Sequence, residues 1–369
     1  MARALAAGLV AALSLLPLAA FAAPPVPDQA SIAALEKRVP ELMRQAKVPG
    51  LSLALIRDGK IYWRKSFGMK DAAHPVTEAT TFEAASLSKV VFATIVLKLA
   101  DEGRIDLDAP LNRYVDTRHV LDVREDPRLA AITARMVLSH RTGFADWRPS
   151  GGALQIHFPP GDHFSYSGEG FIYLQRAVET ITGKGLEELA REDVFLPLGM
   201  TSSSYVWRPD FADSTAIGHD KDGAPQPKKK RDAMAAYSLQ TNAVDYARFL
   251  IALMKGGGLS RERLLDMETA QTPVPKDCTV QCFDTPRAFA PGLAWGLGVG
   301  LEDTPEGKAL WHWGDNGAFK AYMVAYPRTR SGLVMFANSE NGLEIVDELA
   351  KTALGSGQPA IRWVLANPS

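Results

Sequence analysis

Short β-prone segments lie near both ends of the chain. Residues 51–56 and 61–67 are apolar and rich in β-branched and aromatic residues, and Asp58-Gly59 between them predicts a β-hairpin. Further short segments of this kind follow late in the chain at 295–300, 309–313, 320–326 and 332–338. Because Gly, Pro or Asn bounds each of them, the pattern predicts an antiparallel sheet.

The middle of the chain shows helical patterns instead. Residues 86–102 are apolar almost all round and end at Gly103, which is typical of a buried helix with a glycine C′ residue. Residues 243–255 predict a second helix, with Asn242 as its N-cap and Gly256 past its end. The same reasoning predicts helices over three more ranges, 170–182, 186–193 and 343–354.

These patterns together predict an α+β fold. One antiparallel sheet, flanked by helices, would be built from both chain ends, with a mostly helical region inserted between them. We expect the sheet region to comprise residues 28–80 and 290–356, the insertion 81–289, and a C-terminal tail 357–369. A cleft between the two parts is a natural ligand site.

Composition narrows the class of protein. Of the 369 residues, 46% are hydrophobic and 22% are charged, which is ordinary for a globular protein and excludes a disordered chain. The formal net charge of −1 provides no field for a nucleic-acid partner. With 2 cysteines, a multi-cysteine zinc site is excluded.

The first 22 residues are predicted to be a secretory signal peptide. Arg3 supplies a positive start, residues 8–18 are apolar, and Ala20-Phe21-Ala22 fits the small-x-small cleavage rule. A membrane anchor is the alternative, but the apolar run is short and Pro17 interrupts it. We therefore expect export to a bacterial periplasm or outside the cell, without stable membrane insertion after cleavage.

The two cysteines are consistent with export. Cys278 and Cys282 are four positions apart, and in an oxidising compartment they are expected to form a small disulfide. Closing so short a loop stabilises the fold by about 2 kcal/mol at most. A redox or metal role is the alternative, although no further ligands lie nearby in the sequence.

The first candidate motif is Ser86-Leu87-Ser88-Lys89, at the start of the predicted buried helix. Residues at i and i+3 share a helix face, so the Lys89 amine can lie beside the Ser86 hydroxyl. A neutral amine in a desolvated pocket can accept the serine proton. The alternative is an N-cap serine followed by a surface lysine.

Two more motifs complete a candidate site. A phenol such as that of Tyr166, in Tyr166-Ser167-Gly168, can relay a proton to a leaving group, although a packed tyrosine is the alternative. In His312-Trp313-Gly314-Asp315, Gly314 would allow close approach of a substrate to a strand edge. The Asp315 and Ser86 backbone N–H groups could then form an oxyanion hole. The alternative for this segment is a strand that ends in a turn.

In order and placement, the three motifs resemble those of the class C β-lactamase and DD-peptidase family of penicillin-recognising serine hydrolases. Further similarity lies in segments 101–108, 138–144 and 245–250, and it extends over about residues 32–354. The resemblance implies that Ser86 is the acylated nucleophile, that Lys89 is its base or tunes its reactivity, and that Tyr166 is the proton shuttle. It also implies that His312 faces the cleft near the substrate's polar end and that no metal or cofactor is required.

Two departures from the family pattern bear on the substrate. Gly168 stands where the family often has Asn, which removes a side-chain amide able to bond the substrate's acyl group. His312 replaces a lysine, so a permanent charge suited to a substrate carboxylate gives way to a mostly neutral imidazole. Both changes favour an esterase or D-peptidase that acts on a small ester, amide or peptide. The alternatives are a true β-lactamase and a penicillin-binding or cell-wall-binding protein without turnover.

One charge run remains, Lys228-Lys229-Lys230-Arg231, and it is predicted to be a solvated loop. Contact with an anionic wall or lipid is the alternative.

Overall fold

The computed structural model describes residues 26–116, 126–150, 152–304 and 307–368. The predicted signal peptide, residues 1–22, lies outside these ranges. Within them, no helix combines the length and the apolar character needed to cross a membrane.

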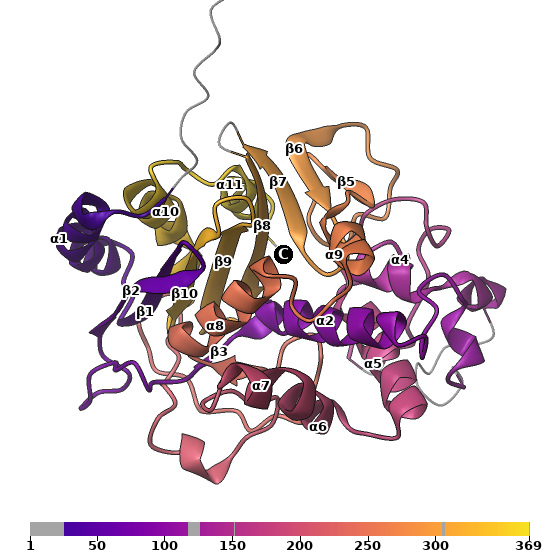
Figure 1. Ribbon diagram of the computed structural model, residues 1–369, viewed down its shortest axis with the longest axis horizontal. Coiled ribbons are helices and arrows are strands. Elements are labelled where there is room, and N and C mark those ends of the chain that lie inside the picture. The colour runs from indigo at the N-terminus through magenta and orange to yellow at the C-terminus, as the bar shows by residue number, and fades with distance from the viewer. Residues whose placement is uncertain (1–25, 117–125, 151, 305–306, 369) are drawn as a thin grey trace, which may run out of the picture.

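The sheet has eight strands in the order β2-β1-β10-β9-β8-β7-β6-β5, and every neighbouring pair is antiparallel. Its first five strands by position are β2 (Lys60–Gly68), β1 (Gly50–Arg57), β10 (Ser331–Ala337), β9 (Lys320–Tyr326) and β8 (Gly307–Asp315). The sheet continues through β7 (Gly300–Thr304), β6 (Phe289–Trp295) and β5 (Thr272–Pro275). Strands from both chain ends therefore lie side by side, which confirms the predicted fold class (Figure 1).

Both faces of the sheet are covered at its centre, where β1, β9 and β10 are buried on both sides. In β1, Ala54 and Ile56 belong to one hydrophobic core, whereas Leu53 and Leu55 belong to the other, as the twofold alternation of a strand requires. The first core contains buried residues of α2 (Ser88–Asp101), α5 (Gly168–Thr182) and α8 (Ala243–Met254). The second contains those of α1 (Gln29–Gln45), α10 (Val346–Leu354) and α11 (Pro359–Ala366).

The inserted region is mostly helical and lies beside and below the sheet in Figure 1. The other helices in the described part of this region are α4 (Ala134–Leu138), α6 (Leu186–Ala190), α7 (Leu196–Leu198) and α9 (Arg261–Glu268). A π-helical turn (Arg191–Phe195) joins α6 to α7, and a small two-stranded sheet pairs β3 (Phe82–Glu83) with β4 (Gln240–Thr241). The 3₁₀ turns cover Ala85–Leu87, Leu111–Arg113, Pro127–Ala131, Pro209–Phe211 and Gly342–Ile345.

The helices predicted at 86–102, 170–182 and 243–255 are present, and Asn242 is the N-cap of α8, where its side chain accepts the Asp245 N–H. The strand predicted at 295–300 is wrong. Strand β6 ends at Trp295, and the glycine-rich residues 296–299 form the connection to β7. Gly298 has a φ of +79°, and a Cβ there would lie 2.2 Å from the Ala93 Cβ of α2, so glycine lets this turn press against the helix.

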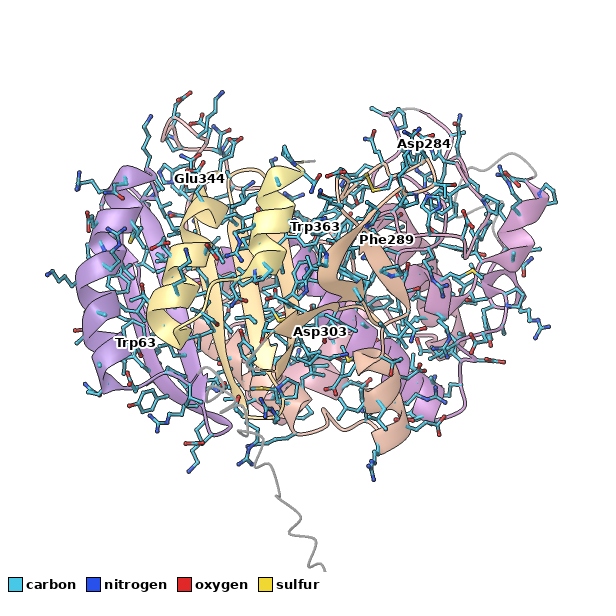
Figure 2. All side chains as sticks on the ribbon, turned by 90° about the horizontal axis from the view of Figure 1, so that it is seen from above. Trp63, Asp284, Phe289, Asp303, Glu344 and Trp363 are labelled. Atoms are coloured by element: carbon cyan, nitrogen blue, oxygen red, sulfur yellow. A yellow bond between two sulfur atoms is a disulfide. The ribbon has the colours of Figure 1, made fainter. Side chains whose placement is uncertain are left out.

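Five of the described helices were not predicted from the sequence: α1, α4, α7, α9 and α11. Pro40 interrupts the helical pattern of α1, and α11 begins at Pro359 in a tail with no distinctive motif. Trp363 of α11 lies between the helix and the sheet (Figure 2), and its indole N–H donates to the Pro275 carbonyl of β5 at 2.7 Å. The C-terminal segment therefore completes the second core.

Candidate active site

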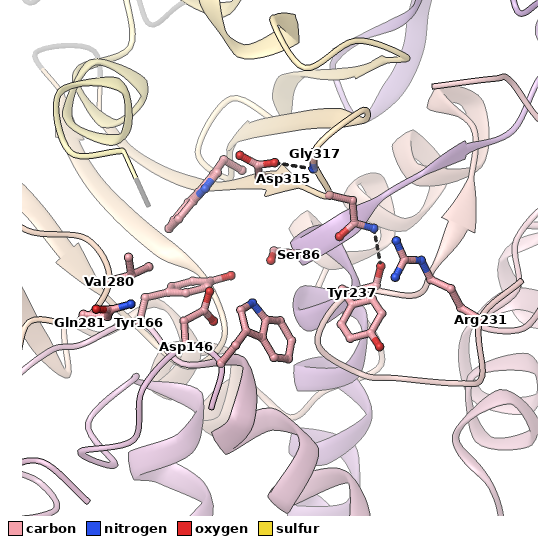
Figure 3. Close-up of a pocket in the computed structure, with 12 residues that line it drawn as sticks. Ser86, Asp146, Tyr166, Arg231, Tyr237, Val280, Gln281, Asp315 and Gly317 are labelled. Atoms are coloured by element: carbon pink, nitrogen blue, oxygen red, sulfur yellow. Dashed lines mark hydrogen bonds between the residues drawn. The ribbon is translucent and has the colours of Figure 1, made fainter. Parts of the chain in front are cut away.

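A cavity of about 610 Å³ lies where the start of α2 meets the end of β8. Residues of all three predicted motifs, Ser86, Tyr166 and Asp315, line it together (Figure 3). The other lining residues are Asp146, Trp147, Arg231, Tyr237, Val280, Gln281, Trp313, Asn316 and Gly317. The structure thus brings together segments that are more than 200 residues apart in the chain.

Ser86 lies in the 3₁₀ turn that leads into α2. The preceding residue, Ala85, has a φ of +49°, a left-handed conformation that is costly for alanine and common at functional sites. The Ser88 hydroxyl holds this turn, because it donates to the Ala85 carbonyl at 2.5 Å and accepts the Leu239 N–H at 3.0 Å. Ser86 is consequently presented to the cavity from a tightly constrained backbone.

The Lys89 amine lies 3.0 Å from the Ser86 hydroxyl, as the i, i+3 spacing predicts. It also donates to the Ala236 carbonyl at 2.7 Å, and the whole side chain is buried. Burial lowers the pKa of Lys89 to about 8, although the Asp146 carboxylate acts in the opposite direction. About one in ten of these amines is therefore neutral at pH 7.

Tyr166 lies beside this pair, with its ring centroid 4.8 Å from the Lys89 amine. Its backbone N–H donates to the Thr279 carbonyl at 3.2 Å, so the segment after α9 fixes its position. Burial, followed by the Asp146 carboxylate, raises the pKa of Tyr166 well above its usual value, and the Ser86 hydroxyl acts against that rise. Tyr166 therefore remains a phenol that can give and recover a proton.

The His140 ring packs against the Tyr166 ring. The two rings stack with centroids 4.1 Å apart, and the His140 Nδ1 accepts the Ser167 N–H at 3.0 Å. Burial, and then Lys89, lowers the pKa of His140 well below its usual value, so the imidazole is neutral. His140 therefore packs against Tyr166 as a neutral ring and holds the backbone of the next residue, Ser167.

His312 does not face the cavity as expected. Its side chain is fully buried, its Nδ1 hydrogen-bonds the Trp313 carbonyl at 2.7 Å, and burial lowers its pKa to about 3. Strand alternation directs Trp313, and not His312, to the cavity. A neutral imidazole therefore packs behind the cavity wall, with its centroid 6.1 Å from that of Tyr166.

The two glycines expected to contact substrate serve close packing within the protein. A Cβ at Gly314 would lie 2.5 Å from the Ala84 carbonyl oxygen, so this glycine lets β8 approach the turn that carries Ser86. A Cβ at Gly168 would lie 2.5 Å from the Trp147 ring. Neither glycine lines the cavity.

The cysteine segment forms one wall of the cavity. The sulfur atoms of Cys278 and Cys282 are 2.14 Å apart, which is disulfide distance. Val280 and Gln281 lie between the two cysteines and line the cavity, and Val280 forms a β-bridge with Tyr166. The five-residue loop thereby holds the segment next to Tyr166.

Sequence reasoning missed Asp146 and Trp147, which follow the family-like segment 138–144 after one intervening residue. It also placed Arg231 in a solvated run, which is wrong for this residue. Lys228, Lys229 and Lys230 are exposed, but Arg231 is half-buried in the cavity wall, where its guanidinium pairs with Glu83 at 3.0 Å. The adjacent Pro-rich, basic sequence carries no signal for that inward turn.

No group of three or more His, Cys, Asp or Glu suited to a metal ion occurs in the described part of the chain.

A family model described as Beta-lactamase matches residues 35–355. Among curated relatives, unguisins hydrolase ungD' of Aspergillus campestris (strain IBT 28561) is 29% identical over 79% of this chain, which spans only 59% of that protein. Penicillin-binding protein 4 of Amycolatopsis lactamdurans is 25% identical over 87% of this chain and 88% of its own length. Esterase EstB of Burkholderia gladioli is 27% identical over 56% of this chain and 59% of its own.

Solved structures share the fold. D-alanine carboxypeptidase AmpC from Burkholderia cenocepacia superposes with a TM-score of 0.73, at 21% identity over 88% of this chain and 98% of that one. A class C beta-lactamase also gives 0.73, at 20% identity over 88% and 96%. The matches confirm the predicted family and fold and agree with the predicted hydrolase class.

Proposed function

The chain belongs to the Beta-lactamase family, and on this premise we propose that it is an exported serine hydrolase that cleaves a small ester or amide through an acyl-enzyme on Ser86. The observation that supports this best is the 3.0 Å contact between the Ser86 hydroxyl and a buried lysine whose pKa is lowered to about 8. A serine needs such a base to become an effective nucleophile.

In the proposed reaction, neutral Lys89 takes the Ser86 proton as the serine oxygen bonds to the substrate carbonyl carbon. The Ser86 and Asp315 backbone N–H groups would stabilise the resulting oxyanion. Tyr166 donates its proton to the departing oxygen or nitrogen and recovers one from Lys89. Water then attacks the acyl-enzyme, its hydroxide joins the acyl group, and its proton returns to Ser86.

The charges around the cavity favour substrates without a carboxylate next to the cleaved bond. His312, in the position of the family's lysine, is buried and neutral. Arg231 is the cationic residue of the described cavity wall, and Glu83 already pairs with it at 3.0 Å. Substrate carboxylates, which β-lactams and D-Ala-D-Ala ends carry, would therefore lack an available cation.

Penicillin binding without turnover is the second candidate, and the relative named penicillin-binding protein 4 supports it with similar coverage of both chains. Stable adducts rather than product would distinguish this candidate. Export is part of the proposal on the strength of the signal-like residues 1–22 and of the paired cysteines, since disulfides persist in oxidising compartments.

The test is intact mass spectrometry of the mature protein after reaction with a fluorophosphonate probe, beside the Ser86→Ala variant. We expect one adduct on the parent and none on the variant. Hydrolysis of p-nitrophenyl butyrate by the parent should exceed nitrocefin hydrolysis. No adduct on either protein would contradict the proposed nucleophile, and efficient nitrocefin turnover would overturn the esterase or peptidase assignment.

A further inference from the structure

Three charged side chains line the cavity, and two of them are already paired. Arg231 pairs with Glu83, and Asp315 pairs with Lys320 of β9. Asp146 is different, since no cationic side chain of the described residues lies within ion-pair distance of its carboxylate. The cavity wall consequently carries one carboxyl group without a cationic partner, and burial raises its pKa above the usual value while Lys89 acts against that rise.

Asp146 is held in place by the backbone alone. The Gly168 N–H donates to its Oδ1 at 2.7 Å, and the Gly168 and Glu169 N–H groups both donate to its carbonyl at 3.1 Å. These bonds fix the side chain at the start of α5, where it points into the space that Ser86 and Tyr166 also face (Figure 3). The second carboxylate oxygen has no hydrogen-bond donor among the described residues.

Lys89 does not neutralise this charge by direct contact. Its amine is occupied by Ser86 and by the Ala236 carbonyl, although it acts on Asp146 electrostatically. During acylation Lys89 must be neutral to accept a proton. The Asp146 carboxylate is then left without a balancing cation, and a half-buried charge in that state is costly.

Aromatic rings surround the same space. Trp147, Tyr237 and Trp313 all line the cavity, and the Trp147 and Tyr237 rings meet edge to face with centroids 5.4 Å apart. Trp147 is 44% exposed, so its ring forms part of the cavity mouth. Aromatic faces attract cations, and a carboxylate beside them supplies the ion pair.

We propose that the Asp146 carboxylate, with the aromatic mouth formed by Trp147 and Tyr237, selects substrates that carry a protonated amino group near the scissile ester or amide. The inference rests on the proposed Ser86 hydrolase function and specifies its substrate class as amino esters or peptides with a free amine. The ammonium group would donate to the open carboxylate oxygen and lie against the indole.

The test compares matched substrates. The rate constant kcat/KM is measured for D- and L-alanine p-nitroanilide and for their N-acetylated forms, with p-nitrophenyl butyrate as a neutral reference. We expect the free amine to be preferred by about 10- to 100-fold over its acetylated form, the range of a charged hydrogen bond. Asp146→Asn should abolish that preference, and hydrolysis of the neutral ester reports separately any change in the Lys89 base.

Two further variants complete the test: Asp303→Asn is the control, and Trp147→Leu is a second test of the amine site. Asp303→Asn removes a carboxylate of β7 whose side chain is 70% exposed, and it should leave the amine preference unchanged. Trp147→Leu should reduce the preference even if Asp146→Asn disturbs the start of α5. Because the readout is a ratio between two substrates of one variant, any effect of Asp146 on the Lys89 base cancels.

The outcomes separate this inference from the proposed function. Absence of both fluorophosphonate labelling and neutral ester hydrolysis would refute the hydrolase itself. Hydrolysis of the neutral ester with equal rates for free and acetylated amines would refute the amine site alone. Accumulation of acyl-enzyme by Asp146→Asn on every substrate would also overturn it, because Asp146 would then act in deacylation.

Discussion

The lowered pKa of Lys89 predicts how the activity depends on pH. At its usual value of 10.5, about one lysine in 3,000 is neutral at pH 7, whereas a pKa of about 8 leaves about one in ten neutral. Burial thus raises the population of the competent base about 300-fold. That factor corresponds to about 3 kcal/mol of differential interaction between the protonated and neutral forms.

The ionisation of Lys89 predicts how kcat/KM changes with pH. If acylation requires neutral Lys89, kcat/KM for p-nitrophenyl butyrate should rise about tenfold from pH 7 to pH 9, with a midpoint near 8, because kcat/KM reports ionisations of the free enzyme. Neither His140 nor His312 can cause this rise in kcat/KM with pH. Burial lowers the pKa of His140 far below its usual value and that of His312 to about 3.

A single substitution sharpens the prediction. The Asp146 carboxylate raises the pKa of Lys89, so Asp146→Asn should move the midpoint to lower pH and increase neutral ester hydrolysis at pH 7. The two proteins should converge above pH 9, where both lysines are neutral. The assay is initial-rate kinetics at constant ionic strength, with spontaneous hydrolysis subtracted and fluorophosphonate labelling rates measured in parallel.

A flat profile between pH 6.5 and 9.5 would refute the reasoning, as would a midpoint near 10.5. A shift of the Asp146→Asn midpoint to higher pH would show that the electrostatic coupling has the wrong sign.

Three further predictions concern the surroundings of Ser86. Gly314→Ala should slow fluorophosphonate labelling more than about tenfold, since its Cβ would lie 2.5 Å from the Ala84 oxygen and overpacking costs about 1–3 kcal/mol; parental labelling rates would contradict this. In the double variant Cys278→Ser/Cys282→Ser, the free energy of unfolding measured in urea should fall by up to about 2 kcal/mol, and kcat should also fall. If both values are unchanged, the disulfide loop has no role in stability or activity. Lys89→Met should abolish fluorophosphonate labelling, yet it should stabilise the fold by about 1–3 kcal/mol at pH 7. The pKa of Lys89 is lower in the folded protein than in the unfolded chain, so burying the protonated amine costs folding free energy, and this cost is fully present below pH 8. That gain should shrink as the pH rises from 8 towards 10.5, and an undiminished gain at pH 10 in chemical denaturation would refute it.

The sequence by itself determined the features that depend on local spacing. The hairpin of β1 and β2 follows from Asp58-Gly59 between alternating segments, and Asp58 and Gly59 both adopt positive φ, as that turn requires. The 3.0 Å contact of Ser86 with Lys89 follows from helix geometry, since residues at i and i+3 share a face in any helix. The paired cysteines are likewise four positions apart.

Only the tertiary structure decided which charges remain available in the cavity. Glu83 is 148 residues from Arg231 and 233 from Asn316, yet its carboxylate accepts hydrogen bonds from both. His312 became a buried neutral ring, and Asp146 became the unpaired carboxylate beside Ser86. Pairing and burial depend on how distant elements pack together, whereas the local pattern specifies only the elements themselves. That physical difference explains why the candidate nucleophile and base could be identified from the sequence, but the charge that selects the substrate could not.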